Sequence, residues 1–277
     1  MVRTQKKPPM ILMSAPNGAR KTSADHPELP VTTDEIARTA ALVRDAGAAM
    51  MHVHIRDREG HHLLDAATYR DVIAAIRREV GDTLVVQITT EAVGRYAPSE
   101  QVAVVRETRP EAVSLAIREL IADEASEAPA AEFLAWMKAE AIAPQFILYD
   151  GADVARFNDL RRRGIIPFER TFLLFVLGRY ATAESASAGD LIEFLKALEG
   201  DDPWSVCAFQ DLEHKATVLA AILGGHARVG FENNLLMPDG SVAADNAALV
   251  KVAAETAARF DREIGTADDA RAVLGMT

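Results

Sequence analysis

Residues 49–89 read AMMHVHIRDREGHHLLDAATYRDVIAAIRREVGDTLVVQIT, and this stretch indicates the fold class. The runs Ala49–Ile55 and Leu84–Thr89 are short and apolar, as buried strands are. Between them, Ala66–Val80 carries its apolar side chains at helical spacing. A strand, a helix and a second strand in this order predict a βαβ unit. Its strands are parallel, because the helix returns the chain to the same edge.

The same alternation continues along the chain. Eight such units in about 250 residues favour a (β/α)8 TIM barrel over an open doubly wound sheet. The open sheet usually carries a glycine-rich phosphate loop after its first strand, whereas residues 15–20 contain one glycine, and no G-x-G-x-x-G motif or P-loop occurs. We therefore predict an α/β fold with a single TIM-barrel domain over residues 10–277, preceded by an N-terminal arm over residues 1–9. The other expected strands are Met10–Ser14, Ala112–Ile117, Ile142–Leu148, Thr171–Val176, Trp204–Phe209 and Ala227–Phe231.

Composition argues against several classes of function. The formal net charge of −11 argues against binding to nucleic acid or anionic lipid, since both need clustered positive charge. No apolar run reaches the roughly 18 residues that a membrane-spanning helix requires. The single cysteine, Cys207, cannot form an intrachain disulfide. We expect a cytoplasmic globular protein with neither nucleic acid nor membrane as a partner.

Two polar motifs stand at strand ends on the side of a TIM barrel that carries active sites. His52 and His54 are two residues apart in a strand, so both side chains point to one face. Glu232 follows the eighth strand, which lies close to the second in a closed barrel, and is the natural third ligand. Two imidazoles and a carboxylate form a metal site with open coordination positions. The alternative is that both histidines form hydrogen bonds in a polar barrel interior.

Further polar residues lie at the same end of the expected barrel. Arg228 points into the barrel mouth, where it can clamp a carboxylate or form an interior salt bridge. Thr89 and Thr90 offer hydroxyls to a substrate carboxylate, although a threonine pair is also common in an ordinary strand.

Several other residues are expected to have no catalytic role. His61 and His62 lie in a polar loop and are expected on the surface. Arg179 and Tyr180, after the sixth strand, are candidates for pocket contacts or for surface positions.

Several segments together resemble the beta-keto acid cleavage enzymes, a family that includes the 3-keto-5-aminohexanoate cleavage enzyme. The resemblance covers the chain from residue 10 to at least residue 240. Its most specific parts are His52-Val53-His54-Ile55-Arg56-Asp57 and Gly224-Gly225-His226-Ala227-Arg228-Val229-Gly230-Phe231-Glu232. Further matches are Asn17-Gly18-Ala19, Leu29-Pro30-Val31-Thr32, Ala46-Gly47-Ala48, Gly60 and Gln87-Ile88-Thr89-Thr90.

The resemblance implies a (β/α)8 barrel that binds a divalent metal, usually zinc, through His52, His54 and Glu232. It also implies a Claisen-type exchange, in which a β-keto acid and acetyl-CoA give acetoacetate and a new acyl-CoA. The metal acts as a Lewis acid and Arg228 stabilises the developing anion. The residues assigned to substrate binding are Asn17, Thr89, Thr90 and Ser114. Family members are often tetramers, so a homo-tetramer is expected.

Three parts of the sequence depart from the usual family pattern. The residue after the metal-binding glutamate is usually an aspartate that acts as the base, but here it is Asn233, whose amide cannot accept a proton near neutral pH. The P-E-x-E stretch reads Pro144-Gln145-Phe146-Ile147. Glu91 stands where the family usually has glycine. We hypothesise that Glu91 supplies the missing carboxylate, so that the catalytic set is Arg228, Glu91 and Asn233.

Two other functions remain open on the sequence. A metal-dependent aldolase or hydrolase would use the same three ligands without CoA. A barrel that has lost catalysis and binds a ligand is favoured by Asn233. The acyl-exchange enzyme requires acetyl-CoA, whereas the aldolase or hydrolase does not. The ligand-binding barrel differs from both because it shows no turnover.

Overall fold

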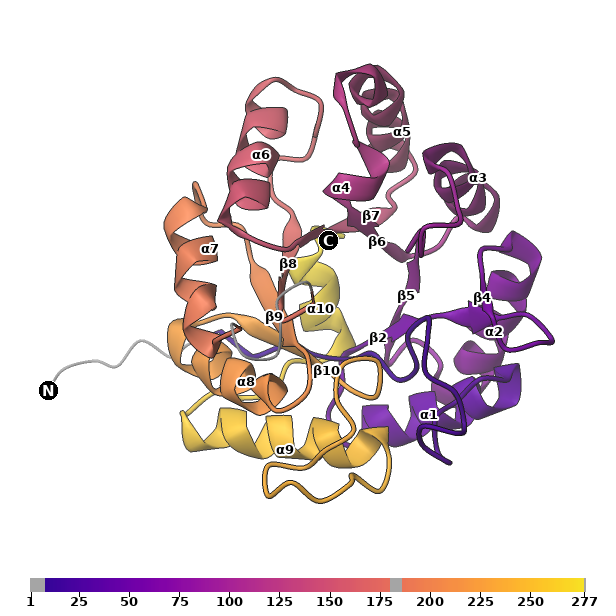
Figure 1. Ribbon diagram of the computed structural model, residues 1–277, viewed down its shortest axis with the longest axis vertical. Coiled ribbons are helices and arrows are strands. Elements are labelled where there is room, and N and C mark those ends of the chain that lie inside the picture. The colour runs from indigo at the N-terminus through magenta and orange to yellow at the C-terminus, as the bar shows by residue number, and fades with distance from the viewer. Residues whose placement is uncertain (1–7, 180–185, 277) are drawn as a thin grey trace, which may run out of the picture.

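The structure is a computed structural model that describes residues 8–179 and 186–276. Most of the expected N-terminal arm, and Tyr180, lie outside the described residues. The predicted TIM barrel is confirmed: eight parallel strands close in the order β1-β10-β9-β8-β7-β6-β5-β2, inside a ring of helices (Figure 1). Every helix in the described ranges is too short or too polar to cross a bilayer. The barrel strands are β1 (Leu12–Ser14), β2 (Met50–Val53), β5 (Val85–Thr89), β6 (Ala112–Ala116), β7 (Ala143–Leu148), β8 (Phe172–Leu177), β9 (Trp204–Ala208) and β10 (His226–Val229).

Helices follow the barrel strands and cover their outer surface (Figure 1). α1 (Thr33–Asp45) begins directly after Thr32: the Thr32 side chain accepts a hydrogen bond from the Glu35 N–H, and the Glu35 carboxylate accepts one from the Thr32 N–H. The other helices are α2 (Ala66–Val80), α3 (Pro98–Thr108), α4 (Ile117–Leu120), α5 (Glu127–Ala139), α6 (Gly151–Arg162), α7 (Leu191–Ala197), α8 (Leu212–Leu223) and α9 (Asn246–Arg259), with the short 3-10 turns Glu124–Ser126 and Ala188–Asp190.

The second expected strand is divided in two. β2 ends at Val53, and β3 (Ile55–Arg56) forms a separate antiparallel hairpin with β4 (His62–Leu63), so His54 lies between two strands. The expectation that His62 lies on the surface is wrong. The hairpin folds its ring to within 5.1 Å of the His54 ring, centroid to centroid, and leaves it 4% exposed. Burial lowers the pKa of His62 to about 3.

A helix that the sequence pattern did not reveal, α10 (Ala267–Val273), closes the amino-terminal end of the barrel. Ala270 and Leu274 share a buried apolar cluster with Ile11 and Phe172, which lie where strands begin. Figure 1 shows α10 through the centre of the barrel. Apolar packing fills this end of the barrel. The polar side chains of the barrel interior therefore lie toward the carboxyl ends of the strands.

Candidate metal centre and active site

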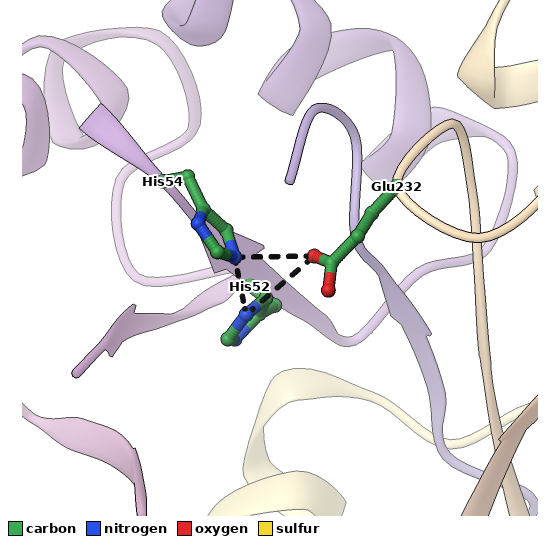
Figure 2. Close-up of side chains that lie close together, drawn as sticks. All are labelled: His52, His54 and Glu232. Carbon is green, nitrogen blue, oxygen red and sulfur yellow. Dashed lines mark hydrogen bonds and ion pairs between the residues drawn. The ribbon is translucent and has the colours of Figure 1, made fainter. Parts of the chain in front are cut away.

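Two neighbouring histidines and a glutamate from a distant part of the sequence meet at the mouth of the barrel. Nε2 of His52, in β2, lies 3.1 Å from Nε2 of His54. Oε2 of Glu232, which follows β10, lies 3.6 Å from Nε2 of His52 and 3.3 Å from Nε2 of His54 (Figure 2). All three residues are at least nine-tenths buried. The structure therefore brings together the three residues that the sequence predicts as metal ligands.

The atoms that face one another in this cluster suit a divalent cation. Oε2 of Glu232 is buried and has no hydrogen-bond partner among the described residues. A buried carboxylate oxygen without a partner is costly, and a cation would satisfy it. One oxygen and two imidazole nitrogens, all within 4.8 Å of one another, form a donor set that zinc and related metals accept with open positions. The residues present thus fit a metal ion.

A chain of hydrogen bonds through the barrel interior orients the ring of His52. Its Nδ1 lies 2.7 Å from Oε1 of Gln87, an atom that can only accept, so Nδ1 donates and Nε2 carries a lone pair toward the cluster. Gln87 donates to Gln145 at 3.1 Å, and Gln145 donates to Ser205 at 3.2 Å. Burial lowers the pKa of His52 to about 3, which keeps the ring neutral, as a ligand must be. In the sequence, the one signal for these hydrogen bonds is the presence of polar residues inside apolar strands.

Arg228 holds the carboxylate of Glu232 in its ionised form. Its Nη2 lies 3.0 Å from Oε1 of Glu232, and both side chains are almost fully buried. Burial opposes ionisation, but the positive charge of Arg228 lowers the pKa of Glu232 well below its usual range. Arg228 is therefore in an interior salt bridge, and its partner is the candidate metal ligand.

The backbone that carries Glu232 is fixed by side chains from other elements. Nζ of Lys21 donates to the carbonyl oxygens of Phe231 at 2.9 Å and of Glu232 at 2.8 Å. The side-chain oxygen of Asn246 accepts from the N–H of Phe231 at 2.9 Å. Neither Lys21 nor Asn246 lies in a sequence motif that would mark it as part of the site.

Glu91 reaches the same cavity and is held there by two arginines. Its Oε1 lies 3.3 Å from Nη1 of Arg20 and accepts a hydrogen bond from Nη2 of Arg179. Its Oε2 lies 3.9 Å from Nδ1 of His54. The sequence offered a pocket contact or a surface position for Arg179, and the structure places it in the pocket. The cavity has a volume of about 20 Å³ and is lined by His52, His54, Thr89, Glu91, Ile147, Tyr149, Val176, Arg179, Arg228 and Glu232.

The three hydroxyl residues predicted to bind substrate differ in their hydrogen-bond partners. Thr89 lines the cavity, and its hydroxyl accepts from the N–H of Glu91 at 3.0 Å. Thr90 donates its hydroxyl to the carbonyl oxygen of Ser114 at 3.0 Å. The Ser114 hydroxyl is buried and has no partner within residues 8–179 and 186–276.

The two asparagines in the predicted set differ. Asn17 donates to the carbonyl oxygen of His54 at 2.9 Å and accepts from the His54 N–H at 3.3 Å, so its amide positions the backbone of a candidate ligand. Asn233 is buried, and neither atom of its amide has a hydrogen-bond partner in the described part of the chain. The roles of Asn17 and Asn233 toward a substrate stay predictions.

Known proteins similar to this chain define its family. The family described as beta-keto acid cleavage enzyme matches residues 9–276. The chain belongs to this family. The resemblance seen in the sequence is thereby confirmed over nearly the whole length of the chain.

Relatives of this beta-keto acid cleavage enzyme family member align along almost their full lengths. It is 30% identical to a 3-keto-5-aminohexanoate cleavage enzyme of Fusobacterium nucleatum, covering 96% of this chain and 98% of the relative. A protein of the same description from Acetoanaerobium sticklandii is 26% identical, covering 97% and 98%. A 3-oxoadipate:acetyl-CoA acetyltransferase of Cupriavidus necator is 24% identical, covering 97% and 95%.

Solved structures support the fold of this family member. A ternary complex of ObcA with a C4-CoA adduct and oxalate superposes with a TM-score of 0.72 at 17% identity, covering 90% of this chain and 68% of that chain. A type I 3-dehydroquinate dehydratase from Clostridium difficile superposes with a TM-score of 0.56 at 10% identity, covering 89% and 92%. At these identities the likeness shows the TIM-barrel fold alone.

Proposed function

We propose that this chain is a metal-dependent acyl-exchange enzyme, which converts a β-keto acid and acetyl-CoA into acetoacetate and a new acyl-CoA. The observation that carries the proposal is the cluster of His52, His54 and Glu232, with its unpartnered carboxylate oxygen, in a member of the beta-keto acid cleavage enzyme family. Relatives described as using acetyl-CoA with 3-oxoadipate or 3,5-dioxohexanoate support the reaction class.

The reaction needs one proton acceptor and one anion-stabilising environment. The metal, held by His52, His54 and Glu232, would supply a Lewis acid. The Glu91 carboxylate would take the proton from the carbon between the keto and carboxylate groups. That carbon then attacks the thioester carbonyl of acetyl-CoA and the CoA thiolate leaves. The thiolate attacks the original keto carbon, the original carbon–carbon bond breaks, and a proton returns to the carbon, which completes acetoacetate.

The remaining predicted residues take supporting roles in this proposal. Arg228 and Asn233 would stabilise the developing negative charge at the barrel mouth. The residues proposed to bind substrate are Thr89, Thr90, Ser114 and Asn17.

We propose zinc as the metal, because two imidazoles and one carboxylate with open positions are a common zinc donor set. Manganese, cobalt and nickel share such ligands, so metal analysis of the purified protein by mass spectrometry is the test. We also propose a homo-tetramer, which light scattering checks, and a cytoplasmic location, which fractionation of the source cells checks.

An isotope-labelling experiment tests the reaction. The protein is incubated with ¹³C-acetyl-labelled acetyl-CoA and a panel of β-keto acids, with and without prior chelation of the metal. We expect label in the acetyl half of acetoacetate, an unlabelled acyl-CoA derived from the keto acid, and loss of both products after chelation. Glu232→Gln serves as the matched negative control.

Two outcomes would favour the other functions. Consumption of a β-keto acid without acetyl-CoA would indicate an aldolase or hydrolase. Tight binding of a β-keto acid with no turnover under any condition would indicate a ligand-binding barrel.

A further inference from the structure

We propose that Arg179 binds the carboxylate of the β-keto acid, and that the substrate takes this arginine from Glu91. The inference rests on the proposed function and assigns the substrate's anionic group to a residue outside the motifs that carry the family resemblance. It follows from comparing the two arginines that line the cavity beside the candidate metal ligands.

Arg228 is poorly placed to exchange partners. Its side chain is 4% exposed and its Nη2 donates to Oε1 of Glu232 at 3.0 Å. Moving it to a substrate carboxylate would leave the charge of Glu232 buried without its arginine, which is strongly unfavourable. Arg228 therefore remains with the candidate metal ligand and stabilises charge from there.

Arg179 borders three cavities at the mouth of the barrel. It lines the small cavity at the metal ligands and two adjoining cavities, of about 250 Å³ and about 260 Å³. The first of these contains Tyr149 and Phe194, and the second contains Lys21 and Phe209. The Arg179 guanidinium lies 5.7 Å from the centroid of the Phe209 ring, and this contact holds the guanidinium in place beside the cavities.

The space next to the metal ligands is too small for a substrate to enter while Glu91 stays in place, so the substrate must replace Glu91 on Arg179. At about 20 Å³ the cavity holds about one water molecule, which is too little for a β-keto acid. The Glu91 carboxylate now occupies Arg179, at the accessible edge where the side chains are 12% and 15% exposed. A substrate carboxylate has the same charge and the same planar geometry, so it can replace Glu91 on the guanidinium.

The exchange gives Glu91 two states in the proposed reaction. Without ligand, Glu91 neutralises Arg179 and keeps this part of the cavity closed by their contact. With the ligand's carboxylate on Arg179, the Glu91 carboxylate is released beside the carbon that must lose a proton. Arg179 then positions the substrate, and Glu91 is the competing anion that binding has to displace.

Binding of acetoacetate to the metal-loaded protein tests this competition. Calorimetry would give dissociation constants for wild type, Glu91→Gln, Arg179→Gln and the double variant, with methyl acetoacetate as the ligand that lacks the negative charge. We expect Arg179→Gln to weaken acetoacetate binding by about tenfold or more, because hydrogen bonds to charged groups are stronger than neutral ones. We expect Glu91→Gln to tighten binding several-fold, and to do so only while Arg179 is present.

Controls separate this pattern from a loss of structure or of metal. The methyl ester should respond to neither substitution, metal content should be equal in all variants, and Arg162→Gln, which removes a comparable surface pairing with Glu199, should bind like wild type. Weaker binding to Glu91→Gln, unchanged binding to Arg179→Gln, or no binding of acetoacetate to wild type would overturn the inference. The binding pattern without any acetyl-CoA-dependent turnover would reject the proposed reaction and leave the assignment of Arg179 standing.

Discussion

His52 shows how one hydrogen bond selects the atom that is offered to a metal. The amide oxygen of Gln87 accepts a hydrogen bond from the Nδ1–H of the ring, which leaves the Nε2 lone pair directed at His54 and Glu232. The amide of Gln87 is itself oriented by its hydrogen bond to Gln145. A neutral amide chain keeps this part of the barrel interior uncharged.

Removal of the Gln87 amide should therefore weaken metal binding. We expect Gln87→Leu to lower metal affinity by roughly tenfold or more, because partners of metal-bound histidines typically contribute 10–100-fold. Gln145→Leu, one hydrogen bond further away, should have a smaller effect of the same sign. Competition with a chromophoric chelator measures both, and equal affinities in all three proteins would refute the ordering.

Glu91 provides the second test on a single side chain. We expect Glu91→Gln to lose acetyl-CoA-dependent turnover by at least about 100-fold, since general bases typically contribute 10²–10⁴-fold, while its metal content stays that of wild type. Turnover is measured as acetoacetate release. Glu140→Gln, which removes a surface carboxylate paired with Arg109, is the control and should keep full activity. Retained turnover in Glu91→Gln would mean that another group is the base.

The segment between β10 and α9 shows how a loop is made rigid enough to carry a metal ligand. Gly230 has a φ of +134°, and a Cβ there would lie 2.6 Å from the carbonyl oxygen of Ala15. Its N–H donates to the carboxylate of Glu213 at 3.0 Å, and burial raises the pKa of Glu213 to about 8. The close approach to Ala15, directly after β1, and the hydrogen bond to the Glu213 side chain of α8 thus set where Glu232 lies.

A glycine pair in this segment tests that dependence. Gly240 also has a positive φ, of +86°, but a Cβ there would meet nothing within 4 Å, so Gly240→Ala should cost about 1 kcal/mol of unfolding free energy. Gly230→Ala adds the clash with Ala15 and should cost more, roughly 3 kcal/mol, with a loss of metal affinity as well. Urea unfolding and metal titration measure the two effects. Equal behaviour of both variants would show that the close approach to Ala15 is unimportant.

Closure of the barrel depends on another buried histidine. Nδ1 of His226, at the start of β10, accepts a hydrogen bond from the N–H of Ile11 at 2.9 Å, next to the contact between the last strand and the first. Burial lowers the pKa of His226 to about 3, from an ordinary value of 6.5. Between these two pH values the unfolded chain binds a proton that the folded chain does not.

Stability should therefore fall as the pH drops from about 6.5 toward 3, because the unfolded state gains the proton over that interval. His226→Gln should be less stable at neutral pH, since it loses the ring, but should show a shallower decline on acidification. Urea unfolding at a series of pH values measures the slope. The exposed His61 offers a control, because His61→Gln should leave the slope as in wild type. Parallel slopes for His226→Gln and wild type would contradict the prediction.

The TIM barrel and the three candidate ligands were predictable from the sequence because both depend on short-range patterns. Alternating apolar runs and amphipathic helices specify parallel strands, and polar residues just after those strands fall at the one end where a TIM barrel places its chemistry. The division of the second strand and the plug formed by α10 were not predictable, because packing between distant segments sets them.

The pairing of charges around the ligands could not be read from local pattern. Whether Glu91 meets Arg179 across the barrel mouth depends on how the closed barrel brings strand ends together in space. These two residues are 88 positions apart in the chain, so their distance is a property of the closed barrel. Composition and periodicity specify which elements form, whereas the electrostatics of the site arise from tertiary contacts that no local window of sequence contains.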